Sequence, residues 1–461
     1  MGLIGDFSSE HNQRLRLMPG VECHILPRAP TRFSQSPLTK RRVFFGKLVV
    51  TKHQEPEETQ MDYINLRPDQ EVDQAGLIYE IGSLYEYFLK KIHDPRKRRG
   101  KRYRLVMLLV LILLAKLGGE DKPSGIADWI AHRSEQLMKM EIFPDHGAPS
   151  HMTYRRVFQE TISLEEFEQL MREFHQSRLE QSEEIVLSVD GKTVRGTIPF
   201  GESRGTHLLA IYVPQQGLVL AEAAVERKEN EIVVAPQILK QVSLKGAIVI
   251  GDAMHTQREV SAQIVEAGGD YIWMAKENQP RTHWAIQKLF VHEACNLRQG
   301  AALSRDFQVA SVVSKGHGRI EKRTITVSTL LNDYLDWPNL AQVFRIERTV
   351  WYSNYHGKTR EIVYGFTSLS PQKADPAKLL TLVRQYWGIE NGLHFRRDVT
   401  FQEDATRLSV GNAGHAMAIF NNLAIGLCLQ HGFQNVAQAR RLFSAQPQKA
   451  LRLILEVSPT L

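Results

Sequence analysis

The chain has 461 residues, which is long enough for two or three domains and a large hydrophobic core. Its 58 Lys and Arg residues exceed its 51 Asp and Glu residues, and the net charge of +7 favours a polyanionic partner without reaching the excess of a histone-like protein. The three cysteines, Cys23, Cys295 and Cys428, are odd in number and far apart, so they indicate neither a disulfide framework nor a zinc site and fit a reducing cytoplasm.

Residues 1–60 differ in composition from the rest of the chain, with scattered prolines and basic residues and one short strand-like run at 42–50. The polar sequence after residues 1–6 lacks the apolar stretch of a signal peptide. We therefore expect residues 1–60 to form a poorly ordered extension, and Met61 would be a natural start for a chain without it. A basic arm that grips DNA is the alternative.

Residues 61–181 are predicted to form a helical N-terminal region. Apolar residues recur at helical spacing from Ile78 to Phe88, and eleven apolar residues follow one another in Leu105–Ala115. Crossing a bilayer takes about 20 apolar residues, so this run predicts a buried helix, and we expect no membrane partner.

A basic loop is predicted between two of these helices, because Lys90–Arg104 contains nine basic residues and one acid and is broken by Pro95 and Gly100. Phosphate groups are the obvious partners of such a loop, and residues 61–181 are therefore predicted to bind DNA. A solvated charged loop is the alternative. A second basic pair lies on a later helix that Ser150 would cap. The DNA contacts expected in this region are Lys97, Arg98, Arg99, Lys101, Arg102, Arg155 and Arg156.

Residues 182–300 are predicted to form the first part of an α/β domain. Short apolar strands alternate with helical segments, and the second and third strands read as a hairpin with a Pro-Gln-Gln-Gly turn. The expected strands are 185–190, 207–213, 217–225, 247–252 and 271–275, and the expected helices are 231–240 and 258–267.

Two aspartates, Asp190 and Asp252, each close an apolar strand and are followed by small residues. Such a strand holds its acid at the rim of a sheet, where a substrate or a metal ion can reach it. Farther on, Glu390, His394 and Arg397 stand at i, i+4 and i+7 of a predicted helix, so that one face would present an acid, an imidazole and a cation. Two aspartates and a glutamate offer hard oxygen ligands for Mg²⁺ or Mn²⁺, which is the equipment for in-line phosphoryl transfer.

Residues 301–368 are predicted to form a β-rich insertion and a return strand. The segment between Asp252 and Glu390 is much longer than a single strand with its connection would require. Residues 369–410 contain the helix with the third acid, and residues 411–461 are predicted to form C-terminal helices at 413–429 and 437–455. The strand-like segments of the insertion are 307–313, 323–328, 343–351 and 361–368.

Six short motifs occur in order along the chain, at Asp190–Gly196, Lys228–Glu231, Gly251–Gln257, Gly269–Gln279, Gly316–Glu321 and Tyr386–Asn391. Together they resemble the motifs of bacterial DDE transposases of the ISAs type, a family that includes the H-repeat-associated proteins. The resemblance spans residues 79–425. It departs from the family where Tyr386 replaces the usual His before Trp387, and where Phe395 replaces the usual Trp after His394.

The resemblance implies an α/β fold with an RNase H-like catalytic core, a β-rich insertion, and helical N-terminal and C-terminal regions. Its acids would be Asp190, Asp252 and Glu390, holding two Mg²⁺ or Mn²⁺ ions, with Asp190 shared and each of the others on one ion. The implied enzyme cuts DNA at the ends of an insertion sequence and joins the freed 3′-OH to target DNA. Its partners would be the double-stranded terminal inverted repeats and target DNA, bound by a homodimer in the bacterial cytoplasm at the nucleoid.

Two other function classes stay open on the sequence. A domesticated transposase would retain the fold and the basic surface as a DNA-binding protein, and an RNase H-like nuclease or resolvase would share the core. Intact acids favour an enzyme, while the basic loop and the long helical N-terminus favour sequence-directed DNA binding. Terminal inverted repeats flanking the gene would distinguish a transposase from the other two classes.

Several basic residues near the acids are further candidates for contacts with DNA. Lys192 and Arg195 follow the first acid, and Lys276 follows the fifth strand. Each is expected to contact phosphate, with a plain salt bridge as the alternative for the first two. His394 and Arg397 share the helical face of the third acid and are expected to contact DNA, with a surface salt bridge as the alternative for Arg397.

Other polar residues have more local explanations. Asn230 and Glu231 are expected to cap the helix that they begin. His255 and Gln257 lie beside the second acid and are candidates for contacts with the DNA end. The rivals of Glu390 for the place of the third acid are Asp398, Glu403 and Asp404.

Overall fold

The computed structural model describes residues 74–139, 147–179, 184–226, 230–298, 304–316, 318–352 and 357–447. Backbone contacts divide the chain into a unit of residues 1–62 and a unit of residues 63–461, and every described residue belongs to the second unit. The extension predicted at 1–60 and the start site at Met61 lie outside the described residues.

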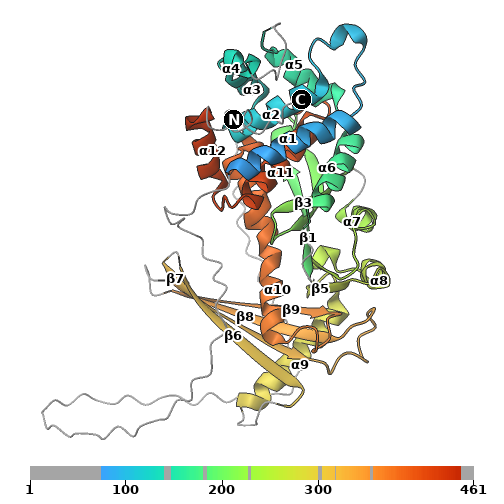
Figure 1. The fold of residues 1–461 in the computed structure, drawn as a ribbon. Helices are drawn as coiled ribbons and strands as arrows, with labels where there is room; N and C mark the ends of the chain where they lie inside the picture. Colours follow the sequence, from blue (N-terminus) through green and yellow to red (C-terminus); the bar gives the residue numbers. More distant parts are fainter. Residues whose placement is uncertain are drawn as a thin grey trace, which may run out of the picture. The chain divides into compact units, whose positions relative to one another are not determined.

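A nine-stranded mixed sheet with the order β3-β2-β1-β4-β5-β9-β8-β7-β6 organises the described unit (Figure 1). β1, β4 and β5 run parallel to one another, whereas β2 runs antiparallel to both β1 and β3. This order and these directions are those of an RNase H-like core, so the predicted fold class is confirmed. The five core strands are β1 (Ile185–Val194), β2 (Thr206–Val213), β3 (Leu218–Val225), β4 (Ala247–Gly251) and β5 (Asp270–Ala275).

The parallel pairs follow from the connections between the strands. α7 (Glu231–Leu239) precedes β4 and α8 (Arg258–Glu266) precedes β5, and a helical crossover lets the chain return in the same direction. β4 has the sequence Ala-Ile-Val-Ile-Gly and is buried along its whole length, as a central parallel strand should be. β2 and β3 form the predicted hairpin, so they need no crossover.

The insertion extends the core sheet. Its strands form an antiparallel meander, and the last of them, β9, pairs antiparallel with β5. All four strands predicted between residues 301 and 368 are present, and each is longer than its apolar pattern indicated. They are β6 (Phe307–Gly316), β7 (Arg319–Ser328), β8 (Gln342–Tyr352) and β9 (Lys358–Thr367).

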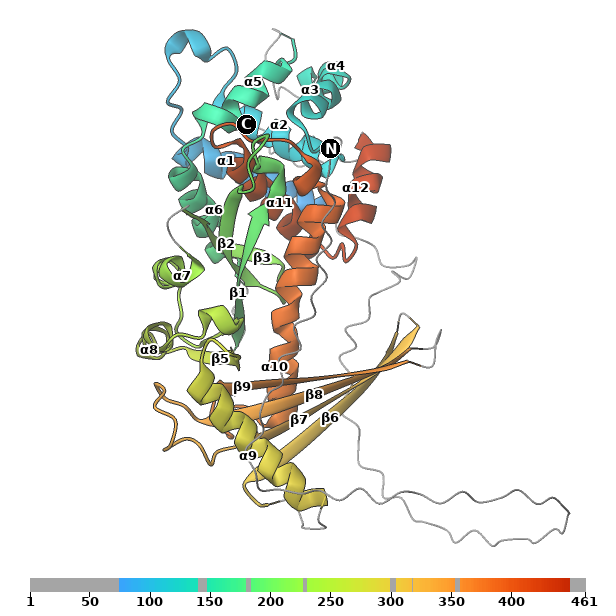
Figure 2. The same cartoon turned by 180° about the vertical axis from the view of Figure 1, so that it is seen from behind.

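Helices cover both faces of the sheet, as Figure 1 and Figure 2 show from opposite sides. One apolar core lies between the sheet and α7, α8 and α9 (Pro280–Arg298). A second lies on the other face beneath α10 (Pro376–Ile389), which packs across β1 and the insertion strands. A third joins β2 and β3 to the N-terminal helices, α11 (Ala413–Gln430) and α12 (Val436–Ala445).

The N-terminal region is helical, as predicted. Every residue of α2 is buried among the surrounding helices, which confirms the buried helix expected from its apolar run. None of the described helices combines the length and the hydropathy that a membrane-crossing segment needs. The helices are α1 (Gln74–Lys91), α2 (Leu105–Leu117), α3 (Pro123–Ala131), α4 (Ser134–Met138), α5 (His151–Arg156) and α6 (Leu164–Arg178). Short 3₁₀ or π turns lie at η1 (Arg98–Gly100), η2 (Val157–Thr161), η3 (Arg195–Thr197) and η7 (Glu403–Ala405).

His175 links α6 to the core sheet. Its ring is buried, and Nδ1–H donates a hydrogen bond to the carbonyl oxygen of Val219 on β3 at 2.7 Å. Burial lowers the pKa of His175 to about 4, because a charged imidazolium would lose its hydration there. The folded protein therefore holds this histidine neutral.

The free energy of unfolding should consequently fall on acidification through the window between the unfolded-state pKa of about 6.5 and the folded-state pKa of about 4. In that window only the unfolded chain binds the His175 proton, and each pH unit is worth about 1.4 kcal/mol. Between pH 7.5 and pH 5 the wild type should lose about 2 kcal/mol more stability than His175→Gln, measured by urea denaturation. Equal losses in the two proteins would rule out His175 as the group responsible.

Candidate active site

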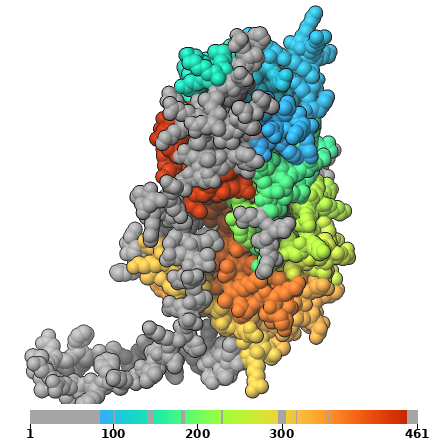
Figure 3. Space-filling model, in the orientation of Figure 1, coloured from blue at the N-terminus to red at the C-terminus, as the bar shows by residue number. Residues whose placement is uncertain are grey.

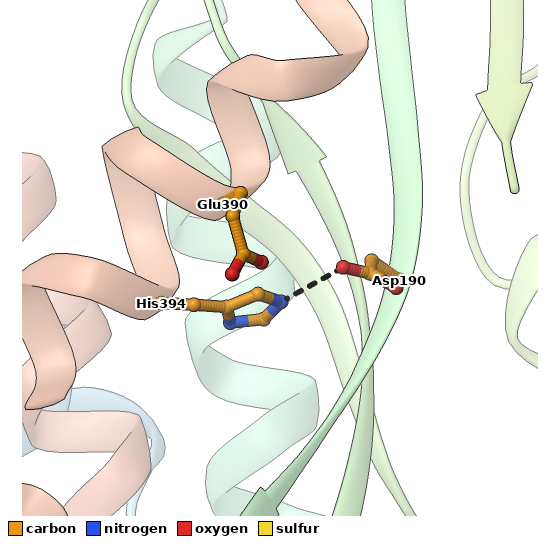
Figure 4. A group of neighbouring side chains, drawn as sticks. All are labelled: Asp190, Glu390 and His394. Atoms are coloured by element: carbon orange, nitrogen blue, oxygen red, sulfur yellow. Dashed lines mark ion pairs between the residues drawn. The ribbon is translucent and has the colours of Figure 1, made fainter. Parts of the chain in front are cut away.

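Asp190, Glu390 and His394 come together on the face of the sheet that α10 covers (Figure 4). Asp190 lies in β1, and the other two belong to η5 (Glu390–His394), the π turn that continues α10. One potential ligand atom from each residue lies within 4.8 Å of those of the other two, and His394 Nε2 is 3.4 Å from Asp190 Oδ2. Two of the three predicted acids are thus neighbours in space although they lie far apart in the sequence.

Asp252 follows β4 at the same edge of the sheet. The register pairs Val189 with Gly251, so Asp190 and Asp252 are the next residues on two adjacent parallel strands. The Asp252 carboxylate caps η4 (Ala253–His255) by accepting a hydrogen bond from the backbone N–H of Met254 at 2.8 Å. It lies outside the group of ligand atoms within 4.8 Å.

The pKa of the Tyr386 hydroxyl responds to all three predicted acids. Burial raises the pKa of Tyr386, and the negative charges of Asp190, Asp252, Glu390 and Glu231 raise it further. The phenol is therefore protonated at neutral pH. This residue replaces the His that the resembling family usually has, and it keeps a hydrogen-bond donor at that position.

His394 fits a metal site better than a DNA contact. Its side chain is buried, and neither ring nitrogen has a hydrogen-bond partner among the described residues. A buried imidazole without a hydrogen bond is unfavourable by itself, and beside Asp190 and Glu390 it completes a set of oxygen and nitrogen ligands. Such a set suits Mn²⁺ and also Mg²⁺. The predicted contact of His394 with DNA stays a prediction; in this structure its ring faces Asp190.

Lys192 is buried and forms ion pairs with Asp398 and Asp404, two of the three alternatives to Glu390 as the third acid. Its Nζ lies 2.6 Å from Asp398 Oδ1 and 3.6 Å from Asp404 Oδ1. Asp404 also accepts a hydrogen bond from the backbone N–H of Arg195 at 2.9 Å. The salt-bridge alternative thus holds for Lys192, which is buried. The Arg195 side chain is exposed, but its Nε lies 3.8 Å from Asp404 Oδ2, so the same alternative also applies to it.

Arg397 lies in the interior, and its predicted contact with DNA is wrong. Its guanidinium is fully buried; Nη1 donates to Glu222 Oε1 at 2.6 Å and Nε donates to Glu403 Oε2 at 2.9 Å. Asn421 and Asn422 donate to the same two carboxylates. Burial would lower the pKa of Arg397, but the two glutamates outweigh burial and raise it.

Arg397 does not share the helical face of Glu390 because the helix geometry changes between the two residues. The residues after α10 form two π turns, η5 and η6 (Arg396–Thr400), which take more residues per turn than an α-helix. Residue 397 therefore leaves the face that Glu390 occupies. With Lys192 and Arg397 neutralising the rivals, Glu390 is the exposed acid of this segment that faces Asp190.

The remaining basic candidates are exposed. The basic loop forms a 3₁₀ turn, η1, between α1 and α2, and the second pair ends α5. In the view of Figure 3, the orange segment that includes α10 reaches the surface beside the yellow insertion. The exposed candidates are Lys97, Arg98, Arg99, Lys101, Arg102, Arg155, Arg156, Arg195 and Lys276.

A cavity of about 470 Å³ begins directly after Asp252. Apolar side chains from α7 and η4 form part of its wall, and polar groups from the segment after β5 form the rest. Gln257 and Lys276, which the sequence singled out separately, both line it. Its lining is Ile232, Ala253, Met254, Gln257, Lys276, Glu277, Asn278 and His283.

Glu231 is the residue whose role the sequence did not predict. Asn230 caps α7 as expected, by accepting a hydrogen bond from the backbone N–H of Val233. Glu231 is instead buried between two histidines, with Oε1 2.8 Å from His207 Nε2 and Oε2 3.1 Å from His255 Nε2. The glycines beside the two aspartates were the available signal, because they make room for this group.

Comparison with known proteins shows which proteins this chain is similar to. Residues 181–427, more than half of the chain, match the family described as "Transposase DDE domain", and residues 87–175 match the one described as "DDE_Tnp_1-associated". The relative named "Putative transposase YncI" of Escherichia coli O157:H7 is 29% identical over 357 residues, which cover 75% of this chain and 87% of the relative.

Two further similarities were found. The "H repeat-associated putative transposase YhhI" of Escherichia coli strain K12 is 26% identical over 76% of this chain and 90% of its own length. Among solved structures, the piggyBac transposase in its synaptic complex with hairpin DNA resembles 84% of this chain and 80% of that chain, with 11% identity and a TM-score of 0.40.

Because Arg397 is buried, its replacement should change the free energy of unfolding. Arg397→Met should lower the free energy of unfolding by about 3–5 kcal/mol, because Glu222 and Glu403 would be left buried without a cation. Arg195→Met, at an exposed arginine, should change it by less than about 0.5 kcal/mol. Urea denaturation measures both. A stable Arg397→Met protein with weakened DNA binding would instead support a phosphate contact.

Proposed function

Because this chain belongs to the transposase DDE domain family, we propose that Asp190, Asp252 and Glu390 are its three catalytic acids. The chain is a DNA transposase of the DDE type. The proposal concerns which residues do the chemistry, which ions they hold and how the DNA is bound.

The observation that carries the proposal is the meeting of two distant segments at one edge of the sheet. Asp190 in β1 and Glu390 in η5 lie within ligand distance of each other, and Asp252 leaves the adjacent parallel strand at the same level. Three carboxylates so arranged have no structural need of one another, since like charges repel at short range. A cation bound between Asp190 and Glu390, within reach of Asp252, would account for this arrangement.

We assign two Mg²⁺ or Mn²⁺ ions to this site, with Asp190 as the shared ligand, Asp252 on one side and Glu390 on the other. When bound, such ions activate a water or a 3′-hydroxyl and stabilise the departing oxygen of a phosphodiester. His394 faces Asp190 and would hold its carboxylate in place or add a nitrogen ligand. Tyr386, kept protonated by its surroundings, would donate a hydrogen bond within the site.

The exposed basic residues would bind the phosphate backbone. Lys276 lines the cavity that begins after Asp252, so it is suited to hold the DNA strand next to the scissile phosphate. The basic loop and α5 would hold DNA farther from the cut. A homodimer in the bacterial cytoplasm would bring two terminal inverted repeats and the target DNA together.

Replacement of each acid tests the assignment. Asp190→Asn, Asp252→Asn and Glu390→Gln should each reduce strand cleavage and 3′-end joining on labelled element ends by about 10³-fold or more, because metal ligation supplies several kcal/mol of transition-state stabilisation. Asparagine at 252 retains the cap of η4, so the loss would not reflect unfolding.

The control for this experiment is Glu259→Gln, which removes an exposed carboxylate in the first turn of α8 and should leave the rates unchanged. DNA binding should survive in all four variants. Cleavage that persists in any of the three acid variants would remove that residue from the catalytic set. Binding without cleavage by the wild type would favour the domesticated, non-catalytic alternative.

The basic loop should account for part of the salt dependence of DNA binding. Each phosphate contact contributes about 0.9 to the slope of log K against log salt, so replacing Lys97, Arg98 and Arg99 together with Ala should reduce that slope by about 2.7. Fluorescence anisotropy over a salt series measures it. Lys240→Ala combined with Lys245→Ala, on exposed lysines after α7, should leave the slope unchanged. An unchanged slope in the triple variant would leave the loop as a solvated surface.

A further inference from the structure

Two glycines next to the catalytic aspartates are closely packed from behind. Gly191 follows Asp190, and a Cβ at this position would overlap the carboxylate of Glu231. Gly251 precedes Asp252, and a Cβ there would lie 3.0 Å from the Cβ of His255. Neither glycine has a positive φ, so space and not backbone conformation explains them.

The packing comes from the face of the sheet opposite the acids. Side chains alternate along a strand, so when Asp190 points toward α10, position 191 opens toward the other face. That face is covered by α7, whose first residue is Glu231. Glu231 therefore lies directly behind the backbone that carries Asp190, and it has no place in the cluster formed with Glu390.

Glu231 ties together the elements that carry the first two acids. His207, which lies opposite Thr193 of β1 in the register, donates from Nε2 to Glu231 Oε1 at 2.8 Å, and its Nδ1 lies 2.8 Å from Thr193 Oγ1. On the other side, His255 of η4 places Nε2 3.1 Å from Glu231 Oε2 and 4.0 Å from Asp252 Oδ1. One carboxylate thus spans from β1 and β2 to the turn that follows Asp252.

The electrostatics agree with a fixed, ionised group. Burial by itself would raise the pKa of Glu231, but its interactions with His207 and His255 outweigh burial and lower it to about 2. His255 is almost completely buried, which leaves it little freedom to move away. A charged carboxylate held by two imidazoles from different elements is a rigid connection.

We propose that Glu231 is a positioning residue that sets the spacing of Asp190 and Asp252 for metal binding, acting from the face of the sheet opposite the one that Glu390 occupies. The inference rests on the proposed assignment of the two aspartates as metal ligands. Groups behind metal ligands fix ligand orientation, and their replacement typically weakens metal affinity or activity by about 10–100-fold.

Glu231→Gln is the informative variant, because it retains the shape but presents an acceptor to only one of the two histidines. The half-saturating Mg²⁺ concentration for DNA cleavage should rise by about 10–100-fold, and rates at saturating Mg²⁺ should largely recover. Mn²⁺ binding, followed by electron paramagnetic resonance without DNA, should weaken by a similar factor. A purely structural role would lower the maximal rate without moving either metal titration.

Two further variants keep the test decisive. Glu293→Gln alters another buried carboxylate, which lies on α9 and accepts a hydrogen bond from the backbone N–H of Ser304. This variant should leave both titrations unchanged. His207→Ala removes one donor to Glu231 at a partly exposed position, so it should fold and shift both titrations in the same direction by a smaller factor. Should Glu231→Gln fail to fold, His207→Ala alone decides.

The two hypotheses fail in different ways. Unshifted Mg²⁺ and Mn²⁺ titrations in a folded Glu231→Gln protein would overturn the positioning role while leaving the catalytic acids in place. Full cleavage by Asp190→Asn would overturn the catalytic assignment, whatever Glu231 does. Weakened Mn²⁺ binding in Glu231→Gln would support the positioning role even in a chain that no longer cuts DNA.

Discussion

The parallel pairing of β1 with β4 is the constraint on which the site depends. Its register aligns Val189 with Gly251, so Asp190 within β1 and Asp252 directly after β4 are neighbouring positions although a hairpin and a helix lie between them in the chain. A slip of one residue would turn a carboxylate to the opposite face, because side chains alternate along a strand. α10 packs on the same sheet through its apolar side, and that packing brings Glu390 to the two aspartates. The positions of the three proposed catalytic acids therefore depend on one strand register and on one helix packed on the sheet.

The acids of the site differ from the acids around them in their partners. Asp398 and Asp404 share Lys192, and the buried Glu403 is neutralised by Arg397. Among the described residues, no lysine or arginine lies within ion-pair distance of Asp190, Asp252 or Glu390, and the two aspartates lie beside His394 and His255. Carboxylates collected without cations repel one another, so the core packing must hold them in place. In the proposed metal site, a divalent cation would relieve this repulsion on binding.

Patterns among neighbouring residues predicted the core strands and the buried helix, because each depends on local alternation or on a short apolar run. Asp252 directly follows β4 as predicted, whereas β1 continues past Asp190 to Val194. Arg397 was misjudged because its spacing was read on an α-helix, and nothing local in the sequence announces the π turns that carry it inside. The contacts of Glu231 were missed for a different reason. Its two histidine partners come from β2 and η4, and only the assembled sheet brings them to one carboxylate. Local chemistry thus gave the candidates, and tertiary packing decided which of them share a site.

The insertion is coupled to the active site by the same sheet. One row of cross-strand neighbours runs from Val189, next to the first acid, through Gly251, Trp273 and Phe366 to Val343 in the insertion. The strands along this row are joined by ladder hydrogen bonds, and Trp273 also fills the space that Gly251 leaves open. A loop connection would allow the insertion to swing, whereas a continuous sheet moves as one body. The insertion strands are therefore joined through one continuous sheet to β1, which carries Asp190, and to β4, which Asp252 follows.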